Sequence, residues 1–431
     1  MDSKADVAVL GGGLAGLAAA TYLARTGRSV VVLEKSGQLG GRARTRTKGG
    51  FLFNVGAHAL YRGGPASAVL RELGVPFAGR SPDARRALGA TARALEPLPV
   101  SLPSLLKSRT LGLSAKWELA RLMQRLPKVD AAAAGGVSLA SWMAAHVRHR
   151  PVADLLHSFL RVATYANDPE RMSAGAALSQ LQLALAPGVL YLDGGWQTLV
   201  DGLAERAREA GVRIVTNADA AALEHEGHVR GVRLRDGGRW VAPAVVATLP
   251  PPALAALPGL EDTALARRAR TRVALRAATL DLGLRRLPRP GAVLAFGLDR
   301  PLYFSVHSAV ARLAPGGGAL VHAMCYPGPQ DTGGAAIEAE LEALVERMQP
   351  GWRDEVVERR FVPDLLVSNA MPLASENGLA GRPGVAVPER PGLFVAGDWV
   401  GPQGQLADAS LASARAAASA IASRPERVAA A

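Results

Sequence analysis

Three glycines near the start of the chain are spaced for binding a dinucleotide. Gly11, Gly13 and Gly16 form a G-x-G-x-x-G pattern directly after Val7–Leu10, a run of four apolar residues. The first glycine permits a tight turn, and the second lets a pyrophosphate approach the backbone. The third allows a helix to pack closely on a strand. The pattern therefore predicts a pyrophosphate-binding loop.

A carboxylate follows at the distance that a bound ribose requires. Glu34 ends a second apolar run, Ser29–Leu33, and its oxygens can accept bonds from ribose hydroxyls. Both apolar runs are predicted to be strands, and the alanine-rich segment Leu14–Arg25 between them is predicted to be a helix. The helix N-terminus, at Leu14 and Ala15, would present unpaired N–H groups and a positive dipole end to the phosphates. Together these elements predict a Rossmann-like α/β domain.

A second glycine-rich stretch is also suited to close contact with a ligand. Within Gly37–Thr45 (GQLGGRART), Gly40 and Gly41 allow the backbone to approach a ligand. Arg42 carries a fork of donors that suits phosphate. The extended run FLFNVGAHAL comes next and is broken by Gly56.

Three of these stretches together resemble the flavoprotein superfamily of phytoene desaturases, monoamine oxidases and protoporphyrinogen oxidases. They are Glu34-Lys35, LGGRART and FNVGAH, and their combined spacing is far more specific than the glycines alone. The resemblance implies FAD rather than NAD as the cofactor, and the second half of the chain has no further G-x-G-x-x-G after a strand for an NAD(P)H domain. No cysteine lies near residues 397 to 415, so we expect the FAD to be bound non-covalently.

The resemblance also implies flavin contacts along the rest of the chain. The turn from Gly56 to His58 should lie beside the isoalloxazine, and the backbone near Ala220 should meet the adenine. Asp398, at the end of the run LFVAGD, fits the aspartate that binds the ribityl or pyrophosphate part. A last helix is predicted over Leu406–Ser423, and its N-terminus would stabilise the anionic reduced flavin. The predicted cofactor-binding residues are Gly11, Gly13, Leu14, Ala15, Gly16, Glu34, Lys35, Gly40, Gly41, Arg42, Gly56, Ala57, His58, Ala220, Gly397, Asp398, Gln405 and Leu406.

His58 lies in one of these flavin-contact motifs and is the candidate catalytic residue. A neutral imidazole beside the flavin could transfer a proton or bond a flavin carbonyl. The alternative is a histidine whose ring is satisfied by the backbone. His307 and His322 fall on predicted strands, where they either line the substrate cavity or lie in the core. The histidines at positions 146 and 149 have no further ligand cluster after them, so no metal site is expected.

The chain is predicted to form two domains, each built from separate segments. Residues 1–64, 191–250 and 386–431 are assigned to the FAD-binding domain. Residues 65–190, rich in Leu, Ala and Arg with helical periodicity, are predicted to form a helical cap on the substrate cavity, and residues 251–385 complete an inserted α+β substrate domain. Four strand-like runs predict a sheet as the floor of this domain: Val273–Leu284, Ala292–Leu298, Leu302–His307 and Ala319–Tyr326.

Two features that amine oxidases of the superfamily generally carry are absent from this sequence. They keep a lysine, linked through water to the flavin N5, in the second half of the chain, whereas the last lysine here is Lys128. They also place an aromatic residue at the start of the last helix, where this chain has Gln405. Both absences favour a desaturase, saturase or isomerase acting on C–C bonds of an apolar, isoprenoid or lipid substrate, with oxygen or a quinone as acceptor. An amine or amino-acid oxidase stays open, as does a non-catalytic flavin-binding assembly protein.

Composition and charge limit the compartment and the partners. Of the 431 residues, 49% are hydrophobic, so a large core is expected. The single cysteine, Cys325, permits no intrachain disulfide and fits a cytoplasmic protein, and neither a signal peptide nor a transmembrane helix is expected. The net charge is +13, but no nucleic-acid motif accompanies it. Between Arg80 and Lys128 there are ten basic residues and three acids, which predicts either a solvated basic face or a peripheral contact with the inner face of a membrane.

Overall fold

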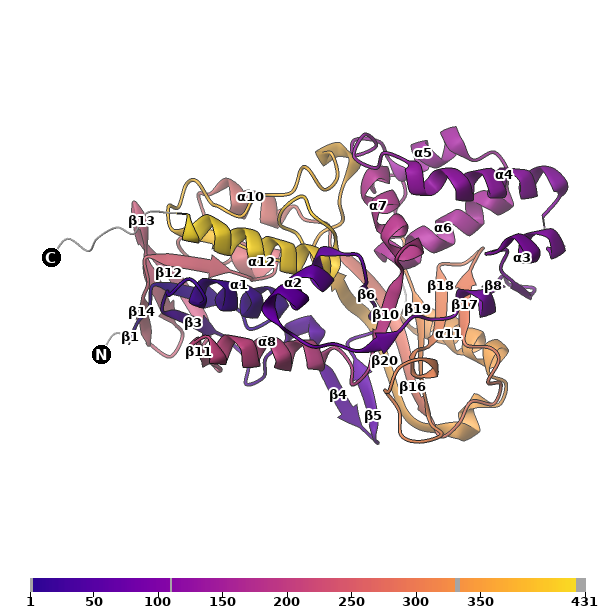
Figure 1. Ribbon diagram of the computed structural model, residues 1–431, viewed down its shortest axis with the longest axis horizontal. Helices are drawn as coiled ribbons and strands as arrows, with labels where there is room; N and C mark the ends of the chain where they lie inside the picture. The colour runs from indigo at the N-terminus through magenta and orange to yellow at the C-terminus, as the bar shows by residue number, and fades with distance from the viewer. Residues whose placement is uncertain (1–2, 109–110, 330–333, 424–431) are drawn as a thin grey trace.

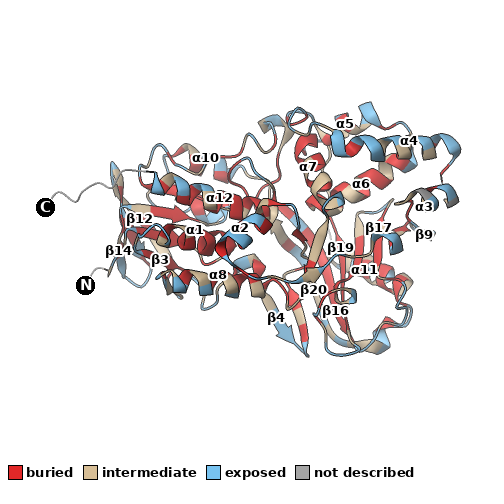
Figure 2. Cartoon of the chain, in the orientation of Figure 1, coloured by how far each residue is buried: buried red, intermediate tan, exposed pale blue. Residues whose placement is uncertain are grey.

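The computed structural model describes residues 3–108, 111–329 and 334–423, and its two lobes lie side by side (Figure 1). The first lobe holds both ends of the described chain, and the second holds most of the middle. Each lobe is assembled from segments that are far apart in the sequence. In both lobes the buried residues lie where the layers face one another, and the exposed residues lie on the outer helix faces (Figure 2).

The first lobe is built on a parallel sheet of five strands in the order β11-β3-β2-β15-β21. The four strands other than β11 are wholly apolar and almost completely buried, as is typical of parallel strands covered on both faces. The strands are β2 (Val7–Leu10), β3 (Val30–Leu33), β11 (Arg213–Val215), β15 (Ala244–Ala247) and β21 (Leu393–Val395). The predicted Rossmann-like, discontinuous α/β domain is confirmed.

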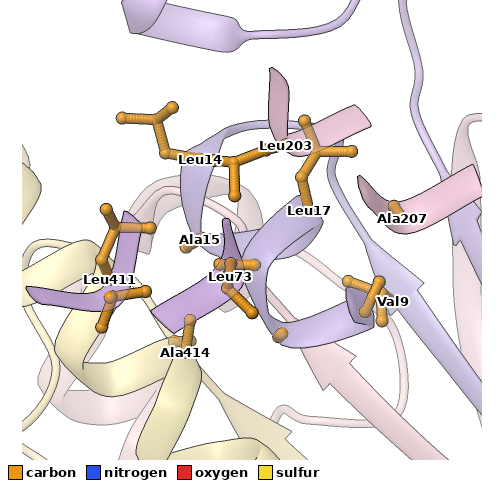
Figure 3. Packing of buried hydrophobic residues seen from close by; sticks show 14 of the residues in the cluster. Val9, Leu14, Ala15, Leu17, Leu73, Leu203, Ala207, Leu411 and Ala414 are labelled. Carbon is orange, nitrogen blue, oxygen red and sulfur yellow. The ribbon is translucent and has the colours of Figure 1, made fainter. Parts of the chain in front are cut away.

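Helices with many small side chains cover one face of this sheet. They are α1 (Leu14–Ala24), α2 (Pro65–Leu73), α8 (Gln197–Glu209) and α12 (Leu406–Ala422). Small side chains let α8 and α12 approach α1 closely. They include Ala15 of α1, Ala207 of α8 and Ala414 of α12 (Figure 3). Leu73 of α2 lies in the same core, although the predicted division places α2 in the substrate domain. The predicted division into domains stays a prediction.

Small sheets and two short helices complete the first lobe. A four-stranded sheet and the helices α9 (Pro251–Ala255) and α10 (Ala264–Arg270) cover the other face of the parallel sheet. The strands of this four-stranded sheet are β1 (Ser3–Lys4), β12 (Ala220–Glu226), β13 (His228–Leu234) and β14 (Arg239–Val241). A hairpin and a three-stranded sheet lie between the lobes: β4 (Thr45–Lys48), β5 (Phe51–Asn54), β6 (Leu60–Tyr61), β7 (Gly79–Arg80) and β10 (Val189–Leu192).

The second lobe contains a sheet of seven strands in the order β20-β16-β19-β18-β17-β8-β9. The four predicted strands of the substrate-domain floor are confirmed: β16 (Leu275–Leu284), β17 (Leu294–Gly297), β18 (Leu302–Val306) and β19 (Ala319–Cys325). The edge strand β20 (Val356–Ser368) was not predicted. Its charged residues and Pro363 hide the apolar alternation, and its register with β16 shifts beside the proline. Helix α11 (Gly334–Met348) packs against this sheet.

A layer of helices lies against the seven-stranded sheet. It consists of α3 (Leu102–Lys107), α4 (Leu113–Arg125), α5 (Leu139–His146), α6 (Arg150–Thr164) and α7 (Ala174–Leu185). The expectation that residues 65–190 are helical is wrong for their early part, which holds β7, β8 (Leu88–Ala90) and β9 (Leu95–Pro97). These strands are two or three residues long and are held by backbone pairing, so they leave no periodicity to read.

Candidate flavin site

A cavity of about 570 Å³ takes its lining from both lobes. This volume lies within the ordinary range of cofactor and ligand sites. Fifteen of the eighteen predicted cofactor-binding residues line it, and the three that do not are Gly16, Gly56 and Gln405. The lining residues from the sequence prediction are Gly11, Gly13, Leu14, Ala15, Glu34, Lys35, Gly40, Gly41, Arg42, Ala57, His58, Ala220, Gly397, Asp398 and Leu406.

The first glycine loop can fold as tightly as it does because its glycines have no side chains. Gly11 has a φ of +104°, which favours glycine, and Gly13 is the N-cap of α1. A Cβ atom on Gly16 would lie 1.9 Å from the carbonyl oxygen of Gly11. Gly16 therefore holds α1 against the turn without lining the cavity, and the loop fits the diphosphate of a dinucleotide.

Glu34 stands at the end of β3 with its carboxylate already held in place. Oε2 accepts a hydrogen bond of 2.7 Å from the Gly12 backbone N–H. Oε1 accepts bonds from the backbone N–H of Ser36, at 2.9 Å, and from its hydroxyl, at 2.8 Å. The side chain is thus fixed at the wall of the cavity, as a residue that receives ribose hydroxyls should be.

Replacing Glu34 with alanine should raise the Kd for FAD about 10- to 100-fold. Charge-assisted hydrogen bonds contribute about 1.5–3 kcal/mol each, and the change also frees the Gly12 N–H that shapes the loop. Fluorescence titration of apoprotein with FAD measures the Kd. Asp6→Ala is the matched control, because Asp6 also binds backbone and hydroxyl donors, those of Ser29, but lies outside the cavity. An unchanged Kd for Glu34→Ala would show that Glu34 does not bind the ribose of FAD.

Arg42 and Asp398 bind one another at the cavity wall. Arg42 Nη1 lies 2.9 Å from Asp398 Oδ2 and also donates to the carbonyl of Val367. Asp398 is buried, and Asn369 donates to it from both its backbone and its side chain. Burial alone would raise the pKa of Asp398, but Arg42 and Asn369 hold this pKa below its usual value. Arg42 and Asp398 both line the cavity, as expected of residues that contact the cofactor. Other protein groups already use part of their hydrogen-bonding capacity.

Gly56 and Gln405 lie behind the cavity wall. Gly56 has a φ of +81°, and a Cβ atom there would come within 2.5 Å of Leu365 Cδ2. Gln405 is the N-cap of α12, but its side chain is buried and Nε2 donates to the Ala176 carbonyl at 2.8 Å. Neither residue lines the cavity, and their predicted contacts with the cofactor stay a prediction. Leu406, the next residue, does line it.

His58 lines the cavity with a ring that is held and neutral. Its Nδ1 lies 3.0 Å from the Gly56 carbonyl oxygen, and its ring packs on Trp196 with 5.0 Å between the centroids. Because a carbonyl oxygen only accepts, Nδ1 carries the hydrogen and Nε2 is left as an acceptor. Burial lowers the pKa of His58 to about 4. The imidazole can therefore accept a proton or a hydrogen bond at neutral pH.

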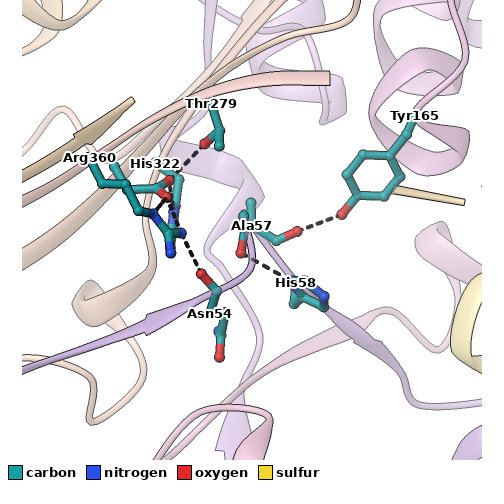
Figure 4. A network of polar contacts seen from close by, with 9 residues as sticks. Asn54, Ala57, His58, Tyr165, Thr279, His322 and Arg360 are labelled. Carbon is teal, nitrogen blue, oxygen red and sulfur yellow. Dashed lines mark hydrogen bonds and ion pairs between the residues drawn. The ribbon is translucent and has the colours of Figure 1, made fainter. Parts of the chain in front are cut away.

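The turn that carries His58 is tied to its surroundings from two sides (Figure 4). On one side Arg360 Nη2 donates to the carbonyl of Asn54 at 2.6 Å. On the other, the Tyr165 hydroxyl donates to the carbonyl of Ala57 at 2.8 Å. Asn54 Oδ1 also accepts from the Trp196 backbone N–H at 3.0 Å. The His58 ring is therefore placed by contacts from β20, from the end of α6 and from the start of α8.

A buried carboxylate, Asp281, anchors Arg360. Asp281 lies on β16 and is fully buried, and both Arg360 Nε and Nη2 donate to its Oδ2. Its Oδ1 lies 2.7 Å from His322 Nδ1 and also accepts from the Thr279 hydroxyl. Burial would raise the pKa of Asp281, but His322 and Arg360 lower it overall. This cluster was not predicted, although an aspartate inside the apolar run ATLDLGL is a signal for it.

Neither His307 nor His322 lines the cavity, so the core alternative holds for both. The His307 ring stacks on Tyr191 with 3.7 Å between centroids and meets the His322 ring edge-on. Neither ring nitrogen of His307 has a hydrogen-bond partner in the described structure, and burial lowers its pKa well below the usual value. Elsewhere His149 binds Glu118, and the described residues hold no group of side chains suited to a metal ion.

Asp408 lines the cavity and was not predicted. It lies in the first turn of α12, and its Oδ1 accepts a bond of 2.8 Å from the backbone N–H of Ala66, in the first turn of α2. Its Oδ2 is buried without a partner among the described residues. Burial raises the pKa of Asp408 to about 6. An acid in the first turn of a helix ordinarily signals only the helix dipole, so nothing in the local pattern singles this residue out.

The Asp408→Asn variant should be more stable than the parent protein at pH 8 but not at pH 4. A carboxyl group whose pKa is raised on folding lowers the free energy of unfolding once the pH rises above its pKa in the unfolded chain, near 4. The loss of stability reaches its full size above the folded pKa of about 6. The expected gain is about 1–3 kcal/mol, because raising a pKa by one corresponds to about 1.4 kcal/mol. Thermal unfolding of the FAD-saturated protein at both pH values measures it. Asp201→Asn, on the exposed side of α8, is the control; a gain that is equal at both pH values would contradict the burial argument.

Comparison with known proteins places this site in a family. The family model described as flavin containing amine oxidoreductase matches residues 14–422. A carotenoid 3,4-desaturase from Haloarcula japonica is 54% identical over 54 residues, which are 12% of this chain and 11% of the relative. A Mycobacterium tuberculosis protein that bears the name of a flavin-containing monoamine oxidase, AofH, is 28% identical over 268 residues, 57% of each chain. The matches thus span from about a tenth to a little over half of these relatives.

The fold comparison agrees with the sequence comparison. The solved structure of an oxidoreductase from Methanosarcina mazei has a TM-score of 0.77 and 20% identity, and the match covers 96% of this chain and 99% of the other. At that identity the likeness shows the fold alone. The family match covers nearly the whole chain and confirms the predicted FAD-dependent oxidoreductase. The chain therefore belongs to the flavin-containing amine oxidoreductase family.

Proposed function

We propose that the protein is a desaturase, saturase or isomerase that uses FAD to act on C–C bonds of an apolar substrate of isoprenoid or lipid type. The observation that carries the proposal is one part of the cavity lining, drawn from residues 55–61, from the ends of α6 and α8 and from β19 and β20, which is apolar or aromatic apart from His58. Its apolar and aromatic residues are Val55, Ala57, Ala59, Leu60, Tyr61, Tyr165, Trp196, Met324, Leu365, Leu366 and Val367. An apolar wall favours an apolar ligand, because it offers few partners to a charged one.

The start of α12 supports this substrate class. An amine-guiding aromatic pair would need an aromatic side chain near position 405, but Gln405 is buried and bonded to Ala176. The sequence also contains no lysine after Lys128 that could serve beside the flavin. Two features expected of an amine oxidase are therefore missing from the chain.

The residues of the cavity have definite tasks under this proposal. FAD supplies two-electron oxidation or reduction at a C–H bond held against its ring system. Glu34 and the glycine loop hold the dinucleotide. His58 Nε2 accepts a proton or a hydrogen bond beside the ring system, and Tyr165, bound to the Ala57 carbonyl, keeps the turn in place. Oxygen or a quinone would take the electrons of a net desaturation.

An amine or amino-acid oxidase is the second candidate. The similarity to AofH over 268 residues favours it, because that relative is named for amine oxidation. Asp408 gives the cavity one carboxyl group that could face an amine. A flavin-binding protein without turnover is the third candidate, and the same experiment separates all three.

The test is turnover by the FAD-loaded protein with two substrate panels. One panel holds isoprenoid polyenes in detergent, with oxygen or a quinone as acceptor for desaturation and, in parallel, dithionite-reduced flavin without oxygen as the electron donor for saturation. The change in polyene absorbance is followed in both. The other holds primary amines and amino acids, with hydrogen peroxide release as the readout. The proposal expects turnover in the first panel alone. Peroxide from amines would establish the second candidate, and a flavin that dithionite reduces but neither panel oxidises or reduces would establish the third.

A further inference from the structure

Two helices at the far end of the second lobe expose large apolar side chains. Leu113 and Trp117 of α4 are 81% and 78% exposed, and Leu106 of α3 is 66% exposed. Lys116 Nζ donates to the Leu106 carbonyl, which holds α3 beside α4. We call Leu106, Leu113 and Trp117, with the exposed basic residues of α4, the α3–α4 patch. Isolated exposed leucines are ordinary, but a grouped set with a tryptophan marks an interaction site.

The apolar side chains of the α3–α4 patch are not needed for the core of the lobe. Ala115 and Leu119 lie on the opposite face of α4 and are buried in the core, as is Leu126 just after it. Leu113 and Trp117 are four residues apart and therefore share the outer face. Figure 2 shows exposed residues along the outside of α4, at the end of the lobe away from the parallel sheet. The helix has thus one apolar face turned inward and a second one turned to solvent.

Basic residues continue the outer face of α4. Arg121 and Arg125 follow Trp117 at intervals of four residues, and both are exposed. Neither forms an ion pair among the described residues, and Lys128 is exposed just beyond the helix. The sole acid between residues 101 and 129 is Glu118, which accepts bonds from the backbone N–H groups of Arg148 and His149. The α3–α4 patch is therefore positive as well as apolar.

We propose that the α3–α4 patch docks this protein on the surface of an anionic lipid bilayer. Apolar tips that enter the boundary of the acyl chains, with arginines left at the headgroups, are the arrangement of interfacial helices. Tryptophan is favoured at that depth because its ring is amphipathic. The patch needs no spanning segment, and among the described residues no helix is both long and apolar enough to cross a membrane. Resting on the proposed function, the docking would hold the protein at a membrane that contains its apolar substrate.

The test uses the FAD-loaded full chain and sedimentation with vesicles. Vesicles of phosphatidylcholine mixed with phosphatidylglycerol should bind the protein at low salt, pure phosphatidylcholine should bind it much less, and added salt should weaken the binding. Trp117→Ser combined with Leu113→Ser should weaken binding at least about tenfold, since each loses burial of a large apolar side chain. Arg121→Gln and Arg125→Gln should each weaken it about fivefold, which corresponds to about 1 kcal/mol per basic residue at the surface.

The controls separate docking from folding and from the reaction. Val357→Ser, an exposed apolar residue on β20, should bind vesicles like the parent. All variants should keep FAD and the same turnover of substrate dispersed in detergent. Equal binding to neutral and anionic vesicles, no binding at low salt, or unchanged binding of the Trp117/Leu113 variant would overturn the proposal. So would a dimer that forms through the patch in place of vesicle binding. Peroxide release from amines with vesicle binding intact would overturn the proposed function alone.

Discussion

Replacing Arg360 with methionine should lower the free energy of unfolding by about 3–5 kcal/mol, the usual loss when a buried charge is left without its partner. The Arg360 side chain is 30% exposed, but the Asp281 side chain is fully buried. Asp281 would keep its contacts with Thr279 and His322 but lose its guanidinium partner, while remaining fully buried. The carbonyl of Asn54 would also lose its donor. Urea unfolding of the FAD-saturated parent and variant measures the loss, with the same dependence of the free energy of unfolding on urea concentration used for both proteins.

Arg359→Met is a closely matched control for this experiment. Arg359 precedes Arg360 on β20, so its side chain points to the opposite face of the strand, where it pairs with Glu338 and Glu342. That cluster is partly exposed, and surface ion pairs of this kind contribute about 0–1 kcal/mol. A loss for Arg360→Met no greater than that for Arg359→Met would show that the buried pair does not stabilise the fold.

The loss for Arg360→Met should also depend on pH. The pKa of Asp281 lies below its usual value in the folded parent protein, so its pairing stabilises the fold above the unfolded pKa near 4 and is lost as the pH falls further. Without Arg360, burial favours the neutral carboxyl. The deficit of the variant should therefore be largest near neutral pH and shrink toward pH 4. A deficit that stays constant over this range would point to lost packing of the arginine side chain instead.

The parts of the fold that follow from local sequence were predicted well. The parallel strands are short apolar runs, and the glycine loop is a local pattern, since Gly11 has a positive φ and Gly16 packs on the Gly11 carbonyl within the same turn. Both features could therefore be read from adjacent residues. Strands that are defined mainly by their pairing partners could not be recognised from adjacent residues. β8 is three residues long, and β20 carries charges on both faces, because its partners lie on α11, β16 and β4. Their assignment depends on neighbours that are distant in the sequence.

The candidate site divides in the same way. The glycine loop and Glu34 were found because the ligand dictates their spacing, whereas the support of the His58 turn comes from three distant segments that carry Tyr165, Asp281 and Arg360. No spacing rule connects these residues. Gln405 shows what a local pattern leaves open. The start of α12 at this residue was predicted correctly, but the pattern did not indicate that its side chain would donate to the Ala176 carbonyl. Backbone position was predictable there, and side-chain direction was not.

The His58→Ala variant should keep its FAD and lose turnover about 10²- to 10⁴-fold, the usual range for removing a general acid or base. Nε2 is the acceptor of a neutral ring at the cavity wall, and the ring is held by Gly56 and Trp196. Because its pKa is lowered to about 4, the contribution of His58 to the rate should be constant from about pH 6 to 8 and should disappear as the pH falls through 4. His228→Ala, on β13 outside the cavity, is the control.

Three measurements on the His58→Ala protein separate the roles that this histidine could have. A proton-transfer role predicts normal FAD content and a large loss of rate. A hydrogen bond that Nε2 accepts from an N–H of the flavin predicts a shifted flavin redox potential and a smaller loss of rate, because the bond tunes the cofactor without moving a proton. A bond to a flavin carbonyl is excluded for this tautomer, since Nε2 carries no hydrogen. A purely structural role predicts lower stability with an unchanged rate per folded molecule. Until a substrate is found, reoxidation of the dithionite-reduced flavin by oxygen or a quinone serves as the rate, and a variant that matches the parent in both rate and potential would exclude His58 from the chemistry.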